Sequence, residues 1–402
     1  MKTIHVYPDS PALTPAPGAL FLLHGGIYPS LRFGPEWSGT AASPTVIRAA
    51  EGEKPVIHPD ECPNRRVGIL LNNVHHLTLE GLEVEGGTHG IGYESTREAG
   101  SLPLENVAIR DCVVHGIRGT HGICVYARND LAPVKNLTIS GCEVYDCQCG
   151  SSESVVLNGN IDGFLIEENL IHDNNNIGID MIGFEGTAKC PDPAPGISPY
   201  AVDMARNGIC RNNSVRNICT EGNTAYYRDG DFDHCAGGIY VDGGQNIEIY
   251  GNTVQCCDIG IEVATEHSPD DDPLFRVTGV RVHHNVIADC HGFAGLCFGG
   301  YARRLGFTEE CEFDHNTLIG SAVQIAVQRS RNNRIHDNVL LGGGIAVLYN
   351  EDCAPEDLVN RFSDNTCICA RDPGGWREEF GQILTDLWDL DLRKWDKREE
   401  AH

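Results

Sequence analysis

Three acidic residues occupy comparable places in neighbouring copies of a repeated segment. Asp180 lies in IGIDMI, Asp242 in GGIYVD and Glu262 in IGIEVA. Carboxyl groups that share a small space repel one another when ionised, so one of them keeps its proton while another stays ionised. Such a set can supply a general acid together with a general base or nucleophile.

These segments belong to a column that continues through nine copies of the repeat. In each copy, apolar residues recur at every second position, which is typical of β-strands. Because strand side chains alternate, the residue after each inward isoleucine should point outward. The outward column then reads Gly92, Cys124, Val156, Asp180, Tyr240, Glu262, Cys297, Ala326 and Ala346.

The spacing of the three acids follows from this alignment. Strands stacked about 4.8 Å apart place Asp180 and Glu262, two copies apart, roughly 9.6 Å from each other, with Asp242 roughly 8 Å from either. This range overlaps the carboxyl separation of inverting glycosidases, about 6.5–9.5 Å, and a retaining pair at about 5 Å stays open.

The elements that must position these acids are repeats of one short unit. Versions include NLTISGCEV, NIEIYGNTV and NRIHDNVL, and one register position reads Leu82, Cys112, Cys142, Asn169, Asn213, Asn252, Asn285, Asn316, Asn338 and Asn365. Short strands with one Asn per unit predict a single-stranded parallel β-helix, an all-β solenoid in which each coil stacks on the previous one. The buried Asn side chains would form a ladder of hydrogen bonds between coils.

This unit, the Asn ladder and the N-terminal phrases FLLHGGIYPSLRF and SGTAASPTVIRAAEGEKPVIH resemble the right-handed parallel β-helix proteins of the pectate-lyase-like superfamily. The resemblance covers about residues 1–370 and implies a carbohydrate-active protein, because the superfamily contains polysaccharide lyases, glycoside hydrolases, uronate epimerases and fructosyl transferases. It does not select the reaction.

Two parts of the chain are expected: a β-helix domain over 1–371 and an amphipathic helical tail over 372–402. In the tail, Phe380, Ile383, Leu384, Leu387 and Trp388 recur at helical spacing. A helix that caps the open end of the solenoid or covers its flank is the favoured interpretation, and a partner-binding helix is the alternative.

Two insertions flank the acidic strands and could form the walls of a cleft. They run from about Phe184 to Arg206 and from about Asn217 to Gly237, and long loops in a compact repeat are usually functional. Aromatic side chains suited to stacking on sugars occur in them, namely Tyr200, Tyr226, Tyr227 and Phe232.

Asp180, Asp242 and Glu262 are therefore the candidate catalytic residues, with Asp242 favoured as one member of the pair. Five more residues are candidates for binding substrate: Tyr240, Glu266, His267, Glu185 and Lys189. A single carboxylate on a β-helix surface is more often a solvated side chain, and Glu266–His267 could equally be a polar turn.

The favoured function is a glycoside hydrolase, or a glycosyl-transferring relative, acting on a neutral or weakly charged oligosaccharide. The main alternative is a polysaccharide lyase that uses calcium to bind uronates, with Lys189 as its nearest base. Residues 229–275 contain eleven acidic residues and no Lys or Arg, which would repel an anionic polymer. A carbohydrate-binding β-helix without catalysis is a third possibility, but it would spread aromatic residues over many coils.

Composition limits the partners. The 402 residues carry 30 Lys plus Arg against 57 Asp plus Glu, a formal charge of −27, which argues against nucleic acid and anionic membranes. No signal peptide is visible, so a cytoplasmic location with reduced thiols is expected. The cysteine spacing does not match structural zinc sites and no phosphate-binding loop is found, so no metal or cofactor is predicted apart from calcium in the lyase alternative. A homo-oligomer stays open.

Overall fold

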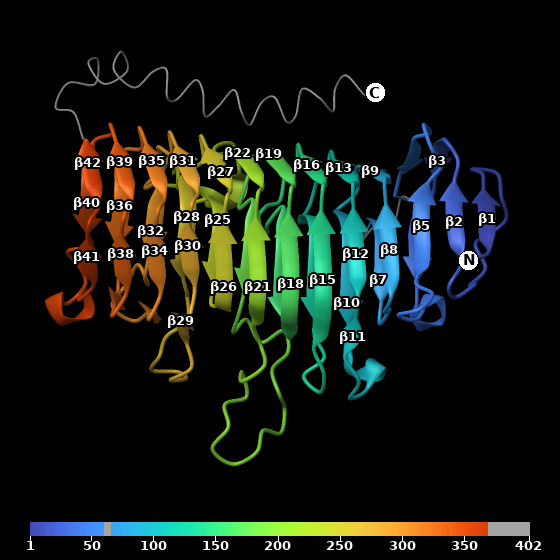
Figure 1. The fold of residues 1–402 in the computed structure, drawn as a ribbon, viewed down its shortest axis with the longest axis horizontal. Coiled ribbons are helices and arrows are strands. Elements are labelled where there is room, and N and C mark those ends of the chain that lie inside the picture. The colour runs from blue at the N-terminus through green and yellow to red at the C-terminus, as the bar shows by residue number, and fades with distance from the viewer. Residues whose placement is uncertain (60–65, 369–402) are drawn as a thin grey trace.

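The computed structural model describes residues 1–59 and 66–368, which wind into a solenoid of three long parallel sheets (Figure 1). Each coil contributes one strand to sheet C, then one to sheet A, then one to sheet B, as in β7 (Val67–Asn72), β8 (Leu77–Glu80) and β9 (Glu83–Glu85). The predicted fold class, an all-β parallel β-helix, is confirmed.

Sheet A forms the face turned to the viewer in Figure 1. Its strands are, in spatial order, β1 (Thr3–Val6), β2 (Leu20–Leu23), β5 (Thr45–Ala49), β8, β12 (Val107–Arg110), β15 (Val134–Ser140), β18 (Ile161–Glu167), β21 (Ala205–Arg211), β26 (Gln245–Tyr250), β30 (Arg281–His283), β34 (Glu312–Asp314), β38 (Arg334–His336) and β41 (Arg361–Ser363), with β11 (Leu104–Glu105) beside β15.

Sheet B comprises β3 (Gly26–Tyr28), β6 (Pro55–Ile57), β9, β13 (Val113–His115), β16 (Glu143–Tyr145), β19 (Leu170–Asn174), β22 (Ser214–Ile218), β27 (Thr253–Gln255), β31 (Val286–Ala288), β35 (Thr317–Ile319), β39 (Val339–Leu341) and β42 (Thr366–Ile368).

Sheet C comprises β4 (Leu31–Phe33), β7, β10 (His89–Ser95), β14 (His121–Ala127), β17 (Val155–Gly159), β20 (Ile179–Ile182), β25 (Gly237–Asp242), β28 (Ile259–Ala264), β32 (Leu296–Phe298), β36 (Val323–Val327) and β40 (Ile345–Tyr349).

The remaining elements are short. They are the hairpin β23 (Tyr227–Arg228) and β24 (Asp231–Phe232), the parallel strands β29 (Arg276–Thr278), β33 (Phe307–Glu309) and β37 (Ser330–Arg331), and the 3-10 turns η1 (Pro35–Trp37), η2 (Arg97–Ala99), η3 (Thr224–Tyr226) and η4 (Pro355–Asp357).

The hydrophobic core runs along the inside of the solenoid. Inward residues such as Ile123, Ile179, Ile239 and Ile261 are fully buried and belong to one continuous cluster. Neighbouring coils pair in register, with Ile123 opposite Val155 and Ile239 opposite Ile261. Burying this apolar surface is the main favourable term in folding.

The predicted Asn ladder is present at the turn between sheets A and B. Asn213 Oδ1 accepts hydrogen bonds from the Asn169 backbone N–H and Nδ2 at 3.1 and 2.9 Å, and the pattern repeats up to Asn365. The residue before each ladder position has a positive φ, as in Gly141 (63°) and Gly251 (64°), so the chain can turn sharply there. This backbone demand explains the Gly, Asn, Asp and His residues at that place.

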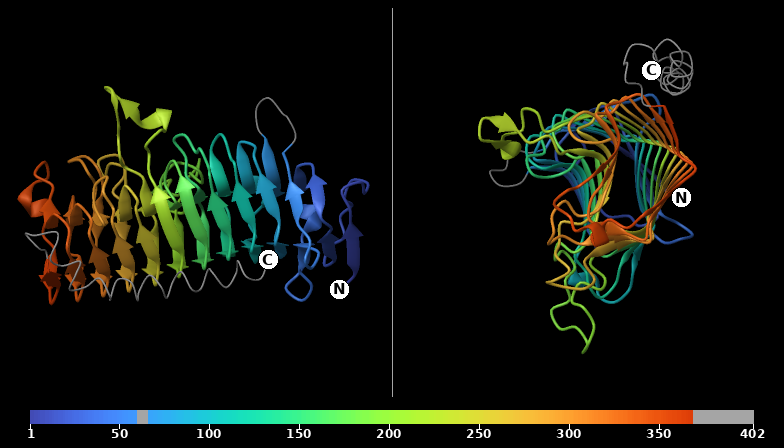
Figure 2. Two further views of the ribbon diagram at one scale, coloured as in Figure 1. Left: turned by 90° about the horizontal axis from the view of Figure 1, so that it is seen from above. Right: turned by 90° about the vertical axis from the view of Figure 1, so that its left-hand side faces the viewer.

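Two insertions rise at opposite ends of the sheet C strands. One spans residues 183–204 between β20 and β21, and the other spans 219–236 between β22 and β25 and contains the β23–β24 hairpin. Figure 2 shows the hairpin and the loop projecting from different corners of the solenoid. Both insertions therefore border sheet C, as the sequence predicts.

One part of the predicted alignment is wrong. In the last coil Ala326 pairs with Leu348, where the sequence alignment placed Ala346, and Ile345, expected inside, is 45% exposed. The expected helical tail over 372–402 lies outside the described residues. No helix in the described part of the chain has the length and apolar character needed to cross a membrane.

Candidate active site

The three predicted catalytic acids lie side by side on sheet C. Asp180 on β20 pairs in register with Tyr240 on β25, which pairs with Glu262 on β28. Asp242 follows two residues after Tyr240 on the middle strand. Their neighbours Ile179 and Met181 belong to the interior core, so the acids point away from the solenoid axis.

The acids are nevertheless buried, because other segments cover this part of sheet C. Asp180, Asp242 and Glu262 expose 2%, 6% and 9% of their surface. The loop after β28 reaches the site, since the Glu266 backbone N–H donates to Asp242 Oδ1 at 3.2 Å. The expected position on the outside of the coil is therefore observed, but the acids are far less solvated than surface carboxylates.

Further carboxylates lie within electrostatic reach and complete what we call the acidic cluster. Asp180 interacts with Glu153, Asp242, Glu262 and Glu266, and Asp242 interacts also with Glu185. The acidic cluster is defined by Glu153, Asp180, Glu185, Asp242, Glu262 and Glu266.

Burial is the main cause of altered ionisation in this cluster. It raises the pKa of Asp180 well above its ordinary value, and the negative charges of Glu153 and Asp242 raise it further. Burial and then Glu266 raise the pKa of Glu262 to about 8. The pKa of Asp242 is also raised by burial and by Glu266 and Glu185, although the Glu266 N–H opposes this rise. These shifts favour the protonated forms of Asp180, Asp242 and Glu262 compared with ordinary surface carboxyls.

Glu153 is the member that the sequence argument missed. It lies just before β17 and its side chain is 13% exposed, and burial raises its pKa to about 8. His121 Nδ1 lies 3.4 Å from its carboxylate, and Tyr126 hydroxyl lies 2.9 Å from His121 Nε2. The sequence alignment could have found Glu153, because the position two residues before the inward residue of each coil is occupied by His89, His121 and Glu153 in three successive coils.

The five predicted binding residues have different outcomes. Tyr240 lies inside the acidic cluster and is buried, and Glu266 lies exposed at its rim. His267 Nε2 lies 3.0 Å from Glu185 Oε1, and this hydrogen bond lowers the pKa of Glu185. Lys189 instead contacts Tyr200 of its own insertion, at 2.8 Å from the hydroxyl. In the described residues it makes no contact with the acidic cluster.

Two buried aspartates hold the insertions at the edges of the site. Asp203 accepts hydrogen bonds from the backbone N–H groups of Gly186 and Ala188, both at 2.6 Å. Asp258 accepts from the N–H groups of Thr220 and Ala236, at 2.9 and 3.2 Å, and so joins the two ends of the other insertion. Asp203 therefore joins the two ends of its own insertion, whereas Asp258 fixes the other insertion to the turn before β28.

The predicted aromatic residues are only partly at the site. Tyr227 and Phe232 pack against each other on the hairpin, and Tyr200 packs against Phe275. The charges of Glu153 and Glu266 act on Tyr226, which is the aromatic residue of this set that comes near the acidic cluster.

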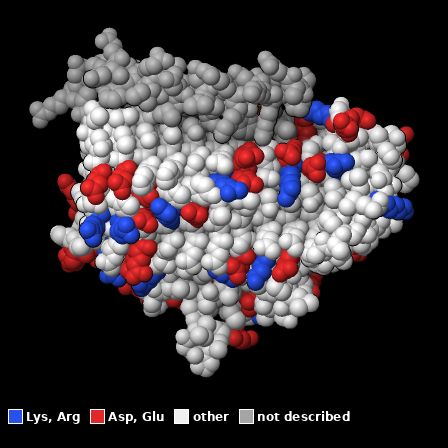
Figure 3. Space-filling view, viewed as in Figure 1, with Lys and Arg blue, Asp and Glu red and all other residues white. Residues whose placement is uncertain are grey.

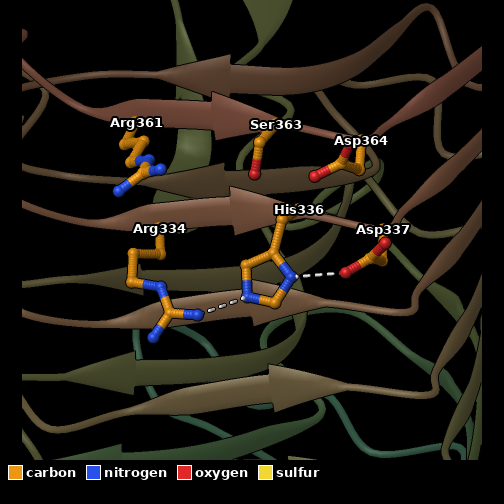
Figure 4. Close-up of a pocket in the computed structure, with 6 residues that line it drawn as sticks. All are labelled: Arg334, His336, Asp337, Arg361, Ser363 and Asp364. Atoms are coloured by element: carbon orange, nitrogen blue, oxygen red, sulfur yellow. Dashed lines mark hydrogen bonds and ion pairs between the residues drawn. The ribbon is translucent and has the colours of Figure 1, made fainter.

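A second candidate site lies at the C-terminal end of sheet A (Figure 4). His336 bonds Asp337 at 2.7 Å and Arg334 at 3.3 Å there. Glu312, Asp314 and His336 bring possible metal-ligand atoms within 4.8 Å of one another. Arg281 already pairs with Asp314 at 2.8 Å and Arg334 with Glu312 at 3.1 Å, so arginines compensate both carboxylates. This cluster is better described as an ion-pair network.

Comparison with known proteins supports the fold. Residues 38–183 match the family model described as periplasmic copper-binding protein (NosD). The uncharacterized protein YwoF of Bacillus subtilis (strain 168) is 33% identical over 337 residues, which are 78% of this chain and 66% of YwoF.

Two solved structures are also similar. The GH136 lacto-N-biosidase from Eubacterium ramulus has a TM-score of 0.59 at 14% identity, over 88% of this chain and 62% of the enzyme. An exopolygalacturonase from Thermotoga maritima has a TM-score of 0.50 at 7% identity, over 92% of this chain and 85% of the enzyme. At such identities the similarity concerns the fold.

Proposed function

We propose that this right-handed parallel β-helix protein is a carbohydrate-active enzyme, specifically a glycoside hydrolase or glycosyl-transferring relative. The observation that carries the proposal is the convergence of Asp180, Asp242 and Glu262 from three neighbouring strands into one buried cluster. The two β-helix structures described above are named as carbohydrate-acting enzymes, which is consistent with this proposal.

Asp180 serves as the general acid. Its Oδ1 atom is buried and receives no hydrogen bond in the described structure, and its pKa is raised well above the ordinary value. A carboxyl group in this state keeps its proton and can donate it to the leaving glycosidic oxygen.

Asp242 serves as the carboxylate that activates water or attacks the sugar. Burial and the charges of Glu266 and Glu185 raise the pKa of Asp242, but the Glu266 N–H donates to its Oδ1 and opposes this rise. Asp180 Oδ1 receives no such hydrogen bond in the described structure, so Asp242 is the better placed of the two to ionise. Asp242 lies diagonally across one strand spacing from Asp180, about 7–8 Å away between Cα atoms. If their carboxyl groups lie about 6.5–9.5 Å apart, a water molecule fits between them and the reaction inverts, whereas a separation of about 5 Å gives a retaining reaction.

Elimination on uronates is the second candidate reaction. It needs a base and cations for the substrate carboxylate, and Lys189, the nearest base suggested by the sequence, contacts Tyr200. Calcium bound to the acidic cluster would have to supply the positive charge in that case. The hydrolase therefore agrees better with the described contacts.

Copper is not carried over from the NosD description. Copper favours imidazole and sulfur ligands, whereas the metal-ligand group found in the described residues has two carboxylates and one histidine. That group also lies outside residues 38–183. No step of the proposed reaction uses copper.

The test is product release from a panel of oligosaccharides, with and without a chelator. The hydrolase predicts new reducing ends that persist in chelator, no unsaturated products, and loss of most activity in Asp242→Asn. The matched control Asp162→Asn changes an acid on sheet A that lies 3.8 Å from Arg206, and it should retain activity. Unsaturated products that disappear with chelator would establish the lyase instead, and saturable binding without products would indicate a binding protein.

A further inference from the structure

The acidic cluster differs in charge balance from the rest of the molecule. On sheet A, acidic and basic side chains lie next to one another (Figure 3), as in Arg211–Glu167 at 2.7 Å and Arg281–Asp314 at 2.8 Å. In the cluster, Glu185 and Glu153 pair with His267 and His121.

The remaining cluster members have no such compensation. Asp180, Asp242, Glu262 and Glu266 form no ion pair within the part of the chain that the structure describes. Asp180, Asp242 and Glu262 are buried, and buried charges in proteins are normally paired, because removing a lone charge from water is costly. Residues 1–59 and 66–368 supply no positive partner for these carboxyls, so a cationic group brought by a ligand would favour their ionised forms.

Unpartnered atoms around the cluster are acceptors. Asn158 and Asn176 are 6% and 1% exposed, and the Oδ1 atom of each lacks a hydrogen-bond partner, as does Asp180 Oδ1. Asn158 lies on β17 opposite Ile182, diagonally across from Asp180 and on the same outward face. Asn176 lies in the turn before β20 and donates to Tyr226 hydroxyl. A ligand that satisfies these atoms must bring hydrogen-bond donors.

A single metal ion does not match this arrangement. An ion requires several ligand atoms around one point at about 2.3–2.6 Å for calcium. Among the described residues, the group whose ligand atoms converge within 4.8 Å is Glu312, Asp314 and His336 on sheet A, away from the acidic cluster. The cluster acids are spread over three strands and three connecting segments, which suits positive charges distributed along an extended ligand.

A buried apolar cluster borders the site toward the N-terminal coils. Cys124, Val156 and Ile182 form a buried cluster on the outer face of sheet C, with Tyr126 packed against them. Ile182 lies two residues from Asp180 on the same face.

From these observations we propose that the ligand of this site is an oligosaccharide of amino sugars with free, unacetylated amines. Each ammonium group carries one positive charge and three donors, which match the uncompensated carboxylates and the unpartnered acceptors. This inference rests on the proposed function and names the substrate class of the same site.

The test compares oligomers of glucosamine and of galactosamine with their N-acetylated forms and with neutral oligosaccharides of equal length. Binding is measured by calorimetry and turnover by product analysis. The free amines should bind at least about tenfold more tightly, since each charged hydrogen bond lost is worth about that factor. Added salt should weaken the binding, and Asp180→Asn should reduce it, whereas Asp162→Asn should not.

The possible outcomes separate the two proposals. Equal or better use of acetylated or neutral sugars would overturn the inference and leave the hydrolase proposal standing. Tight binding of amines without cleavage would support the ligand class and contradict the hydrolase. Failure to bind any sugar would overturn both, and saturable calcium binding that displaces the amines would replace the amino sugar by a metal ion.

Discussion

At the scale of single residues, burial raises the pKa values of Asp180, Asp242 and Glu262 and so distinguishes them from ordinary surface acids. Asp180 and Glu262 occupy the same register position two strands apart, with Tyr240 between them. Because Asp180 and Glu262 are buried, water cannot solvate their ionised forms, and protonation of these carboxyls is favoured.

Glu262 gives a prediction on stability. Its pKa is about 8 in the folded protein against 4.5 ordinarily, so the folded state holds more protons between these values. The free energy of unfolding should therefore fall as the pH rises from about 4.5 to about 8, by at most about 1.4 kcal/mol per pH unit for this group.

Glu262→Gln should weaken this pH dependence, because the glutamine stays uncharged. Urea unfolding at pH 5, 6.5 and 8 measures the slope, and the variant should gain stability relative to the parent as the pH rises. Glu167→Gln, which removes a carboxylate on sheet A, is the control. A parallel pH dependence in Glu262→Gln and the parent would contradict the raised pKa.

The residue identities in the site were predictable only in part. Alternation on β20, β25 and β28 was enough to place Asp180, Tyr240 and Glu262 in one column. The sequence did not predict the burial of this column, because burial depends on how distant loops fold over it. Lys189 was selected for its position near the insertion, but its side chain turns to Tyr200.

At the scale of elements, the Asn ladder holds neighbouring coils in register. Asn252 Oδ1 accepts from the Asn213 backbone N–H and Nδ2, both at 2.9 Å, and Asn252 Nδ2 donates to Cys210 O and Asn285 Oδ1. The ladder residue thus satisfies groups on the coils on both sides.

Asn252→Ala should lower the free energy of unfolding by more than about 3 kcal/mol, because several buried polar groups lose partners that each count for about 1–3 kcal/mol. Chemical denaturation measures the loss. Gln255→Ala, on β27 of the same coil, is the control and should change stability little. A loss below about 1 kcal/mol in Asn252→Ala would show that the ladder contributes less than its hydrogen bonds indicate.

The alignment error in the last coil has a physical reason. A shift of two residues keeps the same side chains facing inward and outward, so alternation alone does not distinguish it. Ile345 and Val347 are both apolar, and the preceding Gly342–Gly344 stretch offers no side chains to fix the register. In the central coils, the acids and large residues are on consecutive strands and the predicted column agrees with the observed pairing through Ala326.

At the scale of the whole molecule, the solenoid makes one site from residues far apart in the chain. The formal charge of −27 is unevenly compensated: acids of sheet A such as Glu167 and Asp314 pair with arginines, whereas the acidic cluster forms no ion pair with Arg or Lys in residues 1–59 and 66–368. Repeat periodicity made the overall architecture predictable, because each coil repeats the same strands and turns. The way in which the insertions pack on sheet C is specific to this chain and could not be read from that periodicity.

The central claim is that Asp180 and Asp242, from different coils, act as one catalytic unit. A double-mutant cycle of Asp180→Asn and Asp242→Asn, measured as kcat on a cleaved oligosaccharide, tests it most directly. Each single change should lower kcat by about 10²-fold or more. The kcat of the double variant should be close to that of the less active single variant, since the effects of residues that act as a unit are not additive. Single variants that retain near-parental kcat, or losses that multiply in the double variant, would contradict the account.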